Sequence, residues 1–263
     1  MTTDTVGGVW YYALELIRAL ERFDVEIVLV TMGADLSRAQ HMEVQARRNV
    51  VLYKSRYRTE WMPEPWKDVR EAGKWLLEIE VRTEPDVVHL NNYAHGVLSW
   101  QAPILMMGHS CVLSWWQAVH GEPAPLQWTH YRQIVNDGLQ AASMVVAPTH
   151  AMLIALEELY GPLTGSRMIP NARDPQAYLP GRKEPWVLTA GRLWDEGKNV
   201  RALVQIAPSL SWPVLVAGEA QGPDGTEVSL VGVHALGKLS STALAGCYAR
   251  ASTYALPARY EPF

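Results

Sequence analysis

Two cations in the segment GRLWDEGKN stand where a bound anion can reach them. Arg192 and Lys198 follow the run WVLTA, which has the composition of a buried strand. Ligands of open α/β sheets bind beyond the carboxyl ends of the strands. A guanidinium fork and a nearby ammonium group at that edge can together neutralise a diphosphate. Two cations alone are also typical of a solvated surface, so this segment leaves both interpretations open.

A pair of glycines, Gly7 and Gly8, precedes a stretch with helical periodicity. Backbone without a Cβ atom can approach a ligand closely, and the N-terminus of a helix presents unpaired N–H groups. The pair therefore fits a strand-to-helix turn that faces a phosphate, although a simple turn also explains it. Only the first three residues remain for the preceding strand, and we expect that strand to be a stub.

These residues need a framework, and the sequence predicts alternating strands and helices. Short runs rich in Val, Ile and Leu indicate buried parallel strands, and stretches with apolar residues at helical spacing indicate amphipathic helices. The predicted strands are 25–31, 49–53, 86–91, 103–108, 143–149, 186–192, 212–218, 228–233 and 252–258, and the main predicted helices are 9–23, 64–83, 198–209 and 240–250. This order predicts right-handed crossovers and open parallel sheets with helices on both faces, an α/β fold.

The alternation is interrupted by IPNARDPQAYLPGRKEP, residues 169–185, whose four prolines do not fit a continuing helix or strand. We place an interdomain linker there, between a first lobe at 1–168 and a second lobe at 186–263. A lobe of this kind usually has more strands than the second one shows, so we expect it to be incomplete.

Composition excludes several classes of protein. The 48% hydrophobic and 19% charged content is typical of a globular chain, and the net charge of −4 disfavours nucleic acid as a partner. The segment RRNVVLYKSRYR is locally basic, and contact with anionic lipid or phosphate is an alternative there to a solvated surface. No apolar run reaches the roughly 18 residues of a membrane span and no secretory signal opens the chain, so we expect a cytoplasmic protein.

Cys111 and Cys247 lack metal-ligand spacing and are expected to be buried, reduced thiols.

Several strings, taken in order, carry a resemblance to a known family. They are TVGGVWYYALELIRAL, PDVVHL, PILMMGHS, SMVVAPT, IPNARD, GRLWDEGKN, VLVAGE, LGKLS and YALPARYEPF. Together they resemble the retaining glycosyltransferases of family 4, a group that includes sucrose-phosphate synthases, glycogen synthases and mannosyltransferases. The resemblance extends over essentially the whole chain. It implies the GT-B fold, with two Rossmann-like lobes of which the second is partial here.

The resemblance also implies roles for residues of the first, acceptor-side lobe. The turn at Gly7 and Gly8 would face the donor diphosphate and the acceptor. His109 follows the PILMMG strand and takes the place of a histidine that lies against the transferred sugar. A satisfied core or surface histidine is the alternative for His109.

In the second lobe the resemblance implies a donor site. Arg192 and Lys198 match the family's diphosphate-binding pair, and Glu261 is the first carboxylate of a two-glutamate motif whose second member would fall beyond Phe263. The turn after the second strand of the lobe and the loop that meets the nucleobase are matched by Gly218, Glu219, Gly237, Lys238 and Leu239.

The function implied is transfer of a sugar from a nucleoside diphosphate to an unidentified acceptor with retention at the anomeric carbon, without a cofactor or a catalytic metal. Three alternatives stay open: a sugar-nucleotide epimerase or glycan phosphorylase of the same fold, a non-catalytic nucleotide-binding or assembly module, and one part of a split GT-B enzyme. Because the chain ends as the glutamate motif begins, we expect the isolated chain to be a poor or inactive transferase. A complementing C-terminal polypeptide or a second copy of the chain would then be its partner.

Overall fold

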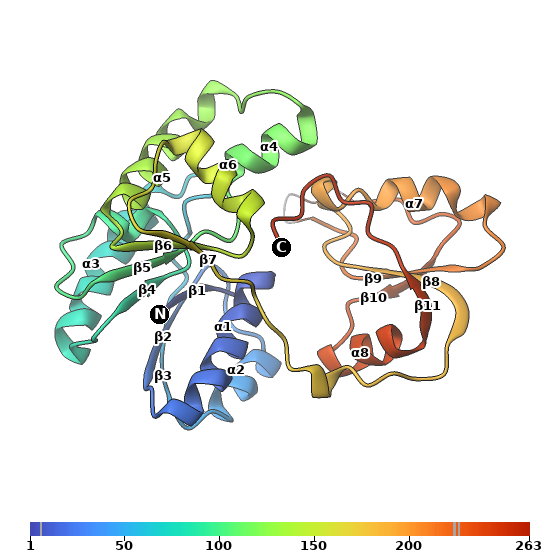
Figure 1. Ribbon diagram of the computed structural model, residues 1–263, viewed down its shortest axis with the longest axis horizontal. Coiled ribbons are helices and arrows are strands. Elements are labelled where there is room, and N and C mark those ends of the chain that lie inside the picture. Colours follow the sequence, from blue (N-terminus) through green and yellow to red (C-terminus); the bar gives the residue numbers. More distant parts are fainter. Residues whose placement is uncertain (6, 223–224, 226) are drawn as a thin grey trace. The chain divides into compact units, whose positions relative to one another are not determined.

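The computed structural model describes residues 1–5, 7–222, 225 and 227–263 (Figure 1). Its contacts divide the chain into two compact units. The first unit comprises Met1–Gln117, Pro123–Ala172 and Pro262–Phe263, and the second comprises Ala118–Glu122 and Arg173–Glu261.

The strands of the first unit are all parallel. Strands β1 (Thr2–Asp4), β2 (Ile27–Met32) and β3 (Val50–Lys54) form one sheet in the order β1-β2-β3. Strands β4 (Val88–Leu90), β5 (Ile104–Met107), β6 (Met144–Ala147) and β7 (Ser166–Met168) form another in the order β4-β5-β6-β7. Side-chain hydrogen bonds connect β1 with the end of β4, because Asn91 Nδ2 donates to the Thr2 carbonyl oxygen at 2.7 Å. Strands therefore follow in sequence to one side from β1 and to the other side from β4. Open α/β sheets bind their ligands at such a point, where the strand order reverses.

Helices of the first unit pack on both faces of the strands. They are α1 (Gly8–Leu20), α2 (Arg38–Gln45), α3 (Trp66–Thr83), α5 (Thr129–Ala141), α6 (His150–Tyr160) and all but the last three residues of α4 (Val112–His120). Successive strand residues point to opposite faces. Accordingly Leu29 packs with the α1 face formed by Trp10 and Ile17, whereas Val30 packs with Leu76 of α3. The predicted helices at 9–23 and 64–83 are thus confirmed, and the amphipathic pattern has the packing it indicated.

The second unit contains a four-stranded parallel sheet. Its strands are β8 (Glu184–Ala190), β9 (Val214–Ala217), β10 (His234–Gly237) and β11 (Ala251–Tyr254), in the order β10-β9-β8-β11. Its helices are α7 (Val200–Ile206) and α8 (Ser241–Arg250). Short 3-10 segments lie at Glu21–Phe23, Ala94–Val97 and Leu126–Trp128 in the first unit and at Pro175–Ala177, Glu196–Lys198 and Ala207–Ser209 in the second. Both units are therefore Rossmann-like layers of parallel strands and helices, as the sequence predicts.

Three predicted elements of the second unit are wrong in their bounds. The strand expected at 228–233 lies instead at His234–Gly237, because a turn at Gly232, whose φ is +89°, separates the apolar run from the sheet. The helix expected at 198–209 is reduced to α7, since Asn199 adopts a left-handed φ of +52° before it and the 3-10 segment Ala207–Ser209, which contains Pro208, follows it. The last strand ends at Tyr254 rather than at residue 258.

Two further expectations concern the whole sequence. Cys111 and Cys247 are buried, reduced cysteines, which confirms the prediction made for them. Within the part of the chain that the structure describes, no helix has the length and apolar character needed to cross a bilayer.

Candidate functional site

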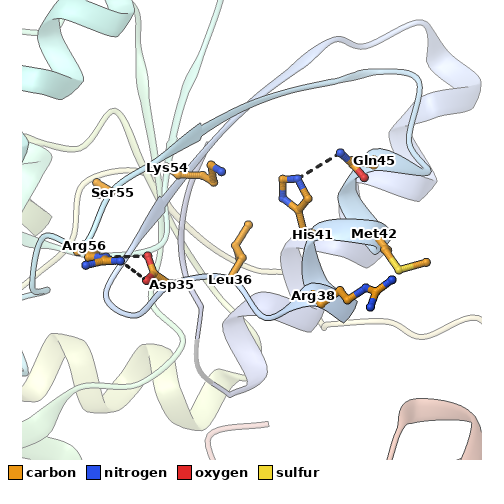
Figure 2. Close-up of a pocket in the computed structure, with 9 residues that line it drawn as sticks. All are labelled: Asp35, Leu36, Arg38, His41, Met42, Gln45, Lys54, Ser55 and Arg56. Atoms are coloured by element: carbon orange, nitrogen blue, oxygen red, sulfur yellow. Dashed lines mark hydrogen bonds and ion pairs between the residues drawn. The ribbon is translucent and has the colours of Figure 1, made fainter.

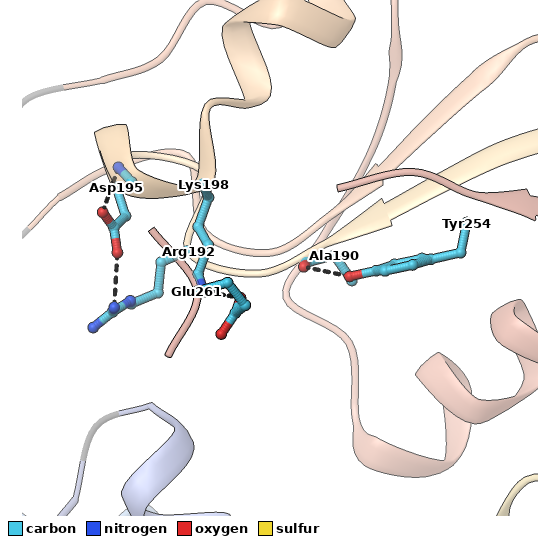
Figure 3. A network of polar contacts seen from close by, with 7 residues as sticks. Ala190, Arg192, Asp195, Lys198, Tyr254 and Glu261 are labelled. Atoms are coloured by element: carbon cyan, nitrogen blue, oxygen red, sulfur yellow. Dashed lines mark hydrogen bonds and ion pairs between the residues drawn. The ribbon is translucent and has the colours of Figure 1, made fainter. Parts of the chain in front are cut away.

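The turn after β8 holds Arg192 through a buried carboxylate (Figure 3). Arg192 Nη2 lies 2.7 Å from Asp195 Oδ2, and the other oxygen of Asp195 accepts a hydrogen bond from the Gly197 amide at 2.9 Å. The Asp195 side chain is only 6% exposed, whereas that of Arg192 is 44% exposed. Asp195 is therefore fixed by the backbone and orients Arg192 from one side, and the rest of the guanidinium group reaches solvent.

Lys198 and Glu261 come together in the same unit. Lys198 Nζ lies 2.5 Å from Glu261 Oε2. The segment before Glu261 is tied to the same turn, since the amides of Arg259 and Tyr260 donate to the Gly197 carbonyl oxygen at 2.8 and 3.2 Å. The structure thus groups the two cations and the glutamate that the resemblance singles out, and pairs each cation with a carboxylate (Figure 3).

The turns after β8, β9 and β10 are joined by backbone contacts around Gly218. The Gly218 amide donates to the Gly237 carbonyl oxygen at 2.8 Å, and the Leu193 amide donates to the Glu219 carbonyl oxygen at 3.0 Å. A Cβ atom on Gly218 would lie 1.8 Å from the Gly191 carbonyl oxygen, and φ at Gly218 is +142°. Only glycine fits there, because both the backbone angle and the close approach exclude a side chain.

The remaining candidates of the second unit, Glu219, Lys238 and Leu239, directly follow the carboxyl ends of β9 and β10. Lys238 Nζ forms an ion pair with Glu219 Oε1 at 2.8 Å, and both side chains are more than half exposed. Such an exposed pair contributes little to stability. Leu239 is half-buried and packs against the core cluster around Trp186.

The glycine turn of the first unit follows β1. Gly7 has φ +80° and ψ −152° and precedes α1, whose first residue is Gly8. A Cβ atom on Gly8 would meet nothing within 4 Å. Packing of the chain therefore does not require glycine at position 8, and the N-terminus of α1 is open at that point to a group outside the chain.

His109 lies two residues beyond the end of β5 and is half-buried. Its Nε2 atom is 2.8 Å from Asn91 Oδ1, and its ring makes a T-shaped contact with that of Tyr12 of α1, with centroids 4.6 Å apart. Burial lowers the pKa of His109 to about 3, with a smaller contribution from the nearby His89. His109 is consequently a neutral imidazole at physiological pH.

Several residues of these groups have no counterpart among the sequence candidates. Asp195 has a local signal, because it stands three residues after Arg192 in the same turn. Asn91 directly follows β4 and so belongs to a carboxyl strand end, which is a weaker signal. Tyr12 has no signal at all, since an aromatic residue on a helix is usually a core residue.

An open pocket of about 750 Å³ lies elsewhere on the first unit (Figure 2). It is lined by residues around the carboxyl ends of β2 and β3 and by α2, including Arg38, Lys54 and Arg56. Arg56 is paired with Asp35. None of the candidate residues lines this pocket, and contact of the basic segment with lipid or phosphate stays an untested expectation.

The described residues contain no group of three or more His, Cys, Asp and Glu side chains that could hold a metal ion. The charged and polar candidate side chains are the cations Arg192, Lys198 and Lys238, the neutral imidazole of His109 and the carboxylates of Glu219 and Glu261. Backbone amides at glycine turns complete both groups, and amides of this kind are common ligands of phosphate.

These features define a class: a two-unit, parallel-sheet α/β protein whose candidate residues follow the carboxyl ends of its strands. The profile of Glycosyltransferase Family 4 matches residues 6–177, more than half of the chain, and the chain belongs to that family. A search of curated proteins found no match.

Solved structures with similar folds are GT-B glycosyltransferases. Sucrose-phosphate synthase from Thermosynechococcus elongatus superposes with a TM-score of 0.74 at 17% identity, over 100% of this chain and 73% of that one. HepE of Anabaena in complex with UDP and glucose gives 0.69 at 17% identity, over 100% and 75%. A glycosyltransferase from Rickettsia africae gives 0.65 at 15% identity, over 98% and 72%. At these identities the likeness establishes the fold.

Proposed function

We propose that the chain transfers a sugar from a nucleoside diphosphate to an acceptor with retention of the anomeric configuration. The observation that carries the proposal is the convergence of Arg192, Lys198 and the Gly218 turn at one sheet edge of the second unit. Membership of glycosyltransferase family 4 supports it. HepE was crystallised with UDP-glucose, which makes a uridine nucleotide the first donor to test.

The demand of the reaction is the charge that accumulates on the departing diphosphate. Preorganised cations at the position of that charge lower the barrier more than they stabilise the bound donor. Arg192 is held by Asp195, so its guanidinium group needs little reorganisation when the phosphate arrives. Lys198, which is 17% exposed, would exchange its Glu261 partner for a phosphate oxygen.

The step balances without an added reactant. The bond from the anomeric carbon to the diphosphate oxygen breaks, and a bond to the acceptor hydroxyl oxygen forms on the same face of the sugar. The acceptor proton passes to the departing phosphate oxygen. Lys198 and Arg192 would carry the charge, and neutral His109 would form a hydrogen bond with a sugar hydroxyl rather than act as a strong base.

Binding is tested first, by calorimetric titration of UDP, GDP and ADP into the chain and its variants. We expect Arg192→Ala and Lys198→Ala to weaken the preferred nucleotide by about 10- to 100-fold, which corresponds to the loss of one charge-assisted hydrogen bond. The matched control is Arg250→Ala. Arg250 also pairs with a carboxylate, that of Glu184, at the first residue of β8 and hence at the opposite end of the strands. Equal affinity in all three variants would refute the donor site.

Turnover is tested with the sugar nucleotide whose base binds best. Proton NMR of the product reads the anomeric configuration, and the same configuration as in the donor is expected. An epimerised donor or a requirement for free phosphate would replace the proposal by an epimerase or a phosphorylase. Donor binding without turnover, also after addition of a polypeptide that supplies the following segment of a relative, would favour a binding module.

A further inference from the structure

The hydrogen bonds around Asn91 have a single possible direction. Asn91 Nδ2 lies 2.7 Å from the Thr2 carbonyl oxygen, which can only accept a hydrogen bond. The amide group is therefore oriented with Oδ1 toward His109 Nε2, at 2.8 Å. Since Oδ1 carries no proton, Nε2 of His109 must be the donor.

A second chain of hydrogen bonds fixes the position of Asn91 itself. The Asn91 backbone amide donates to Thr2 Oγ1 at 3.0 Å, and Thr2 Oγ1 donates to Asn92 Oδ1 at 3.0 Å. Asn92 Nδ2 lies 2.6 Å from His95 Nδ1, and His95 Nε2 donates to the Val69 carbonyl oxygen at 3.0 Å. Thr2, Asn92 and His95 are all buried. The Asn91 amide, which can only donate, and the Val69 carbonyl oxygen, which can only accept, stand at the two ends of this network and leave each donor and acceptor one assignment.

We propose that Asn91 is a positioning residue that holds His109 as its Nε2–H tautomer and presents Nδ1 of the same ring as a hydrogen-bond acceptor. The tautomer of a histidine is set by the partner of its other nitrogen. Among the residues that the structure describes, none is hydrogen-bonded to His109 Nδ1. The edge-to-ring contact with Tyr12 restricts rotation of the imidazole, so the lone pair of Nδ1 has a fixed direction.

The consequence for the reaction depends on the proposed function. An acceptor nitrogen next to the transferred sugar would bind a sugar hydroxyl as a donor. It would disfavour a ligand with no hydroxyl at that place, because the bound ligand would exclude water from the acceptor and leave it without a partner. Asn91 thus acts on the substrate only through His109. It would affect turnover more than binding of the nucleotide, to which the second unit contributes its own residues.

The tautomer is measured directly in the full chain. Nitrogen-15 NMR of labelled imidazoles distinguishes Nε2–H from Nδ1–H, and His109→Gln assigns the signal. We expect wild-type His109 to be predominantly Nε2–H at pH 7.5. A predominantly Nδ1–H signal in the wild-type chain overturns the proposal without any variant.

Two substitutions at one position separate orientation from simple stability. Asn91→Ala removes the acceptor, and the share of Nε2–H is expected to fall by about tenfold relative to Nδ1–H, the factor that one hydrogen bond of ordinary strength provides. Asn91→Asp loses the bond to the Thr2 carbonyl oxygen but keeps an acceptor for Nε2–H, so the tautomer is retained even where the chain is destabilised. The control is Asn136→Ala, at a half-buried asparagine of α5.

Kinetics provide the second readout. In Asn91→Ala we expect kcat to fall about tenfold with KM for the sugar nucleotide nearly unchanged, and Asn91→Asp to recover most of kcat. If activity in both variants falls in proportion to the fall in melting temperature, Asn91 has a structural role and the proposal is overturned. Because NMR needs no turnover, the expected tautomer together with transfer that stays absent after addition of the polypeptide supplying the following segment contradicts the proposed function alone.

Discussion

Gly218 offers the sharpest test of the second unit, because the structure leaves no space for even one added carbon. Gly218→Ala would place a Cβ atom 1.8 Å from the Gly191 carbonyl oxygen and 3.0 Å from its carbonyl carbon. Both atoms belong to the backbone, so no side-chain rotation relieves the clash. The turn after β8 must then separate from the turn after β9 by more than 1 Å, as an order of magnitude from ordinary van der Waals distances.

Two costs follow from this geometry. Overpacking in a closely packed site costs about 1–3 kcal/mol, and a residue other than glycine at a φ of +142° adds about 1–2 kcal/mol of backbone strain. We expect a total of about 3 kcal/mol. At roughly 2–4 °C per kcal/mol for a chain of this size, the melting temperature should fall by about 6–12 °C.

Thermal unfolding followed by circular dichroism measures this change. The matched control is Gly246→Ala in α8, where an added Cβ atom meets nothing within 4 Å. Alanine in the interior of a helix is more stable than glycine by about 0.5–1 kcal/mol, so the control should melt at or slightly above the wild-type temperature. A Gly218→Ala protein that melts within 2 °C of wild type, as a rough threshold set against that scale, would show that the close approach of the two turns is not real.

Three further outcomes are expected. Burial holds the pKa of His109 at about 3, below its ordinary 6.5, so this group stabilises the fold above pH 6.5 and the contribution is lost as the pH falls. Between pH 7 and pH 5 the free energy of unfolding in urea should therefore fall by about 1–2 kcal/mol less for His109→Asn than for wild type. An identical fall in both proteins would contradict the burial of His109. Glu60→Leu should cost about 2–4 kcal/mol in urea unfolding, because buried Glu60 accepts the Tyr93 amide at 2.7 Å; a change below about 1 kcal/mol would be incompatible with this bond. Glu261→Gln should tighten UDP binding about threefold, because it removes the charge beside Lys198, and weaker binding in calorimetry would argue against competition at Lys198.

The sequence predicts those parts of the fold whose signal is local. Strands such as β2 and β9 are buried on both faces, so continuous Val, Ile and Leu identify them. Strand β10, with the sequence HALG, is largely exposed and has no such pattern, so the sequence instead favours a strand in the apolar run before it.

The candidate site divides in the same way. Arg192 and Lys198 could be found because both lie in one short turn. Their carboxylate partners differ: Asp195 is local, whereas Glu261 is 63 residues from Lys198 and was connected to the donor side only by resemblance. The partner of His109 is 18 residues away on a neighbouring strand end, and side-chain distances of this kind depend on strand order, which periodicity does not contain.

The pairing of both cations with carboxylates has a consequence for how binding responds to salt. A phosphate that meets unpaired cations gains attraction that ionic strength screens, so its affinity falls steeply as salt is added. At the proposed donor site an incoming anion would replace Glu261 at Lys198 and share Arg192 with Asp195, so one counter-ion would be exchanged for another and the local charge would change less. Discrimination then depends on geometry: a diphosphate that reaches both cations at once can displace the carboxylate, whereas a monophosphate or chloride ion, which engages one cation at a time, competes poorly.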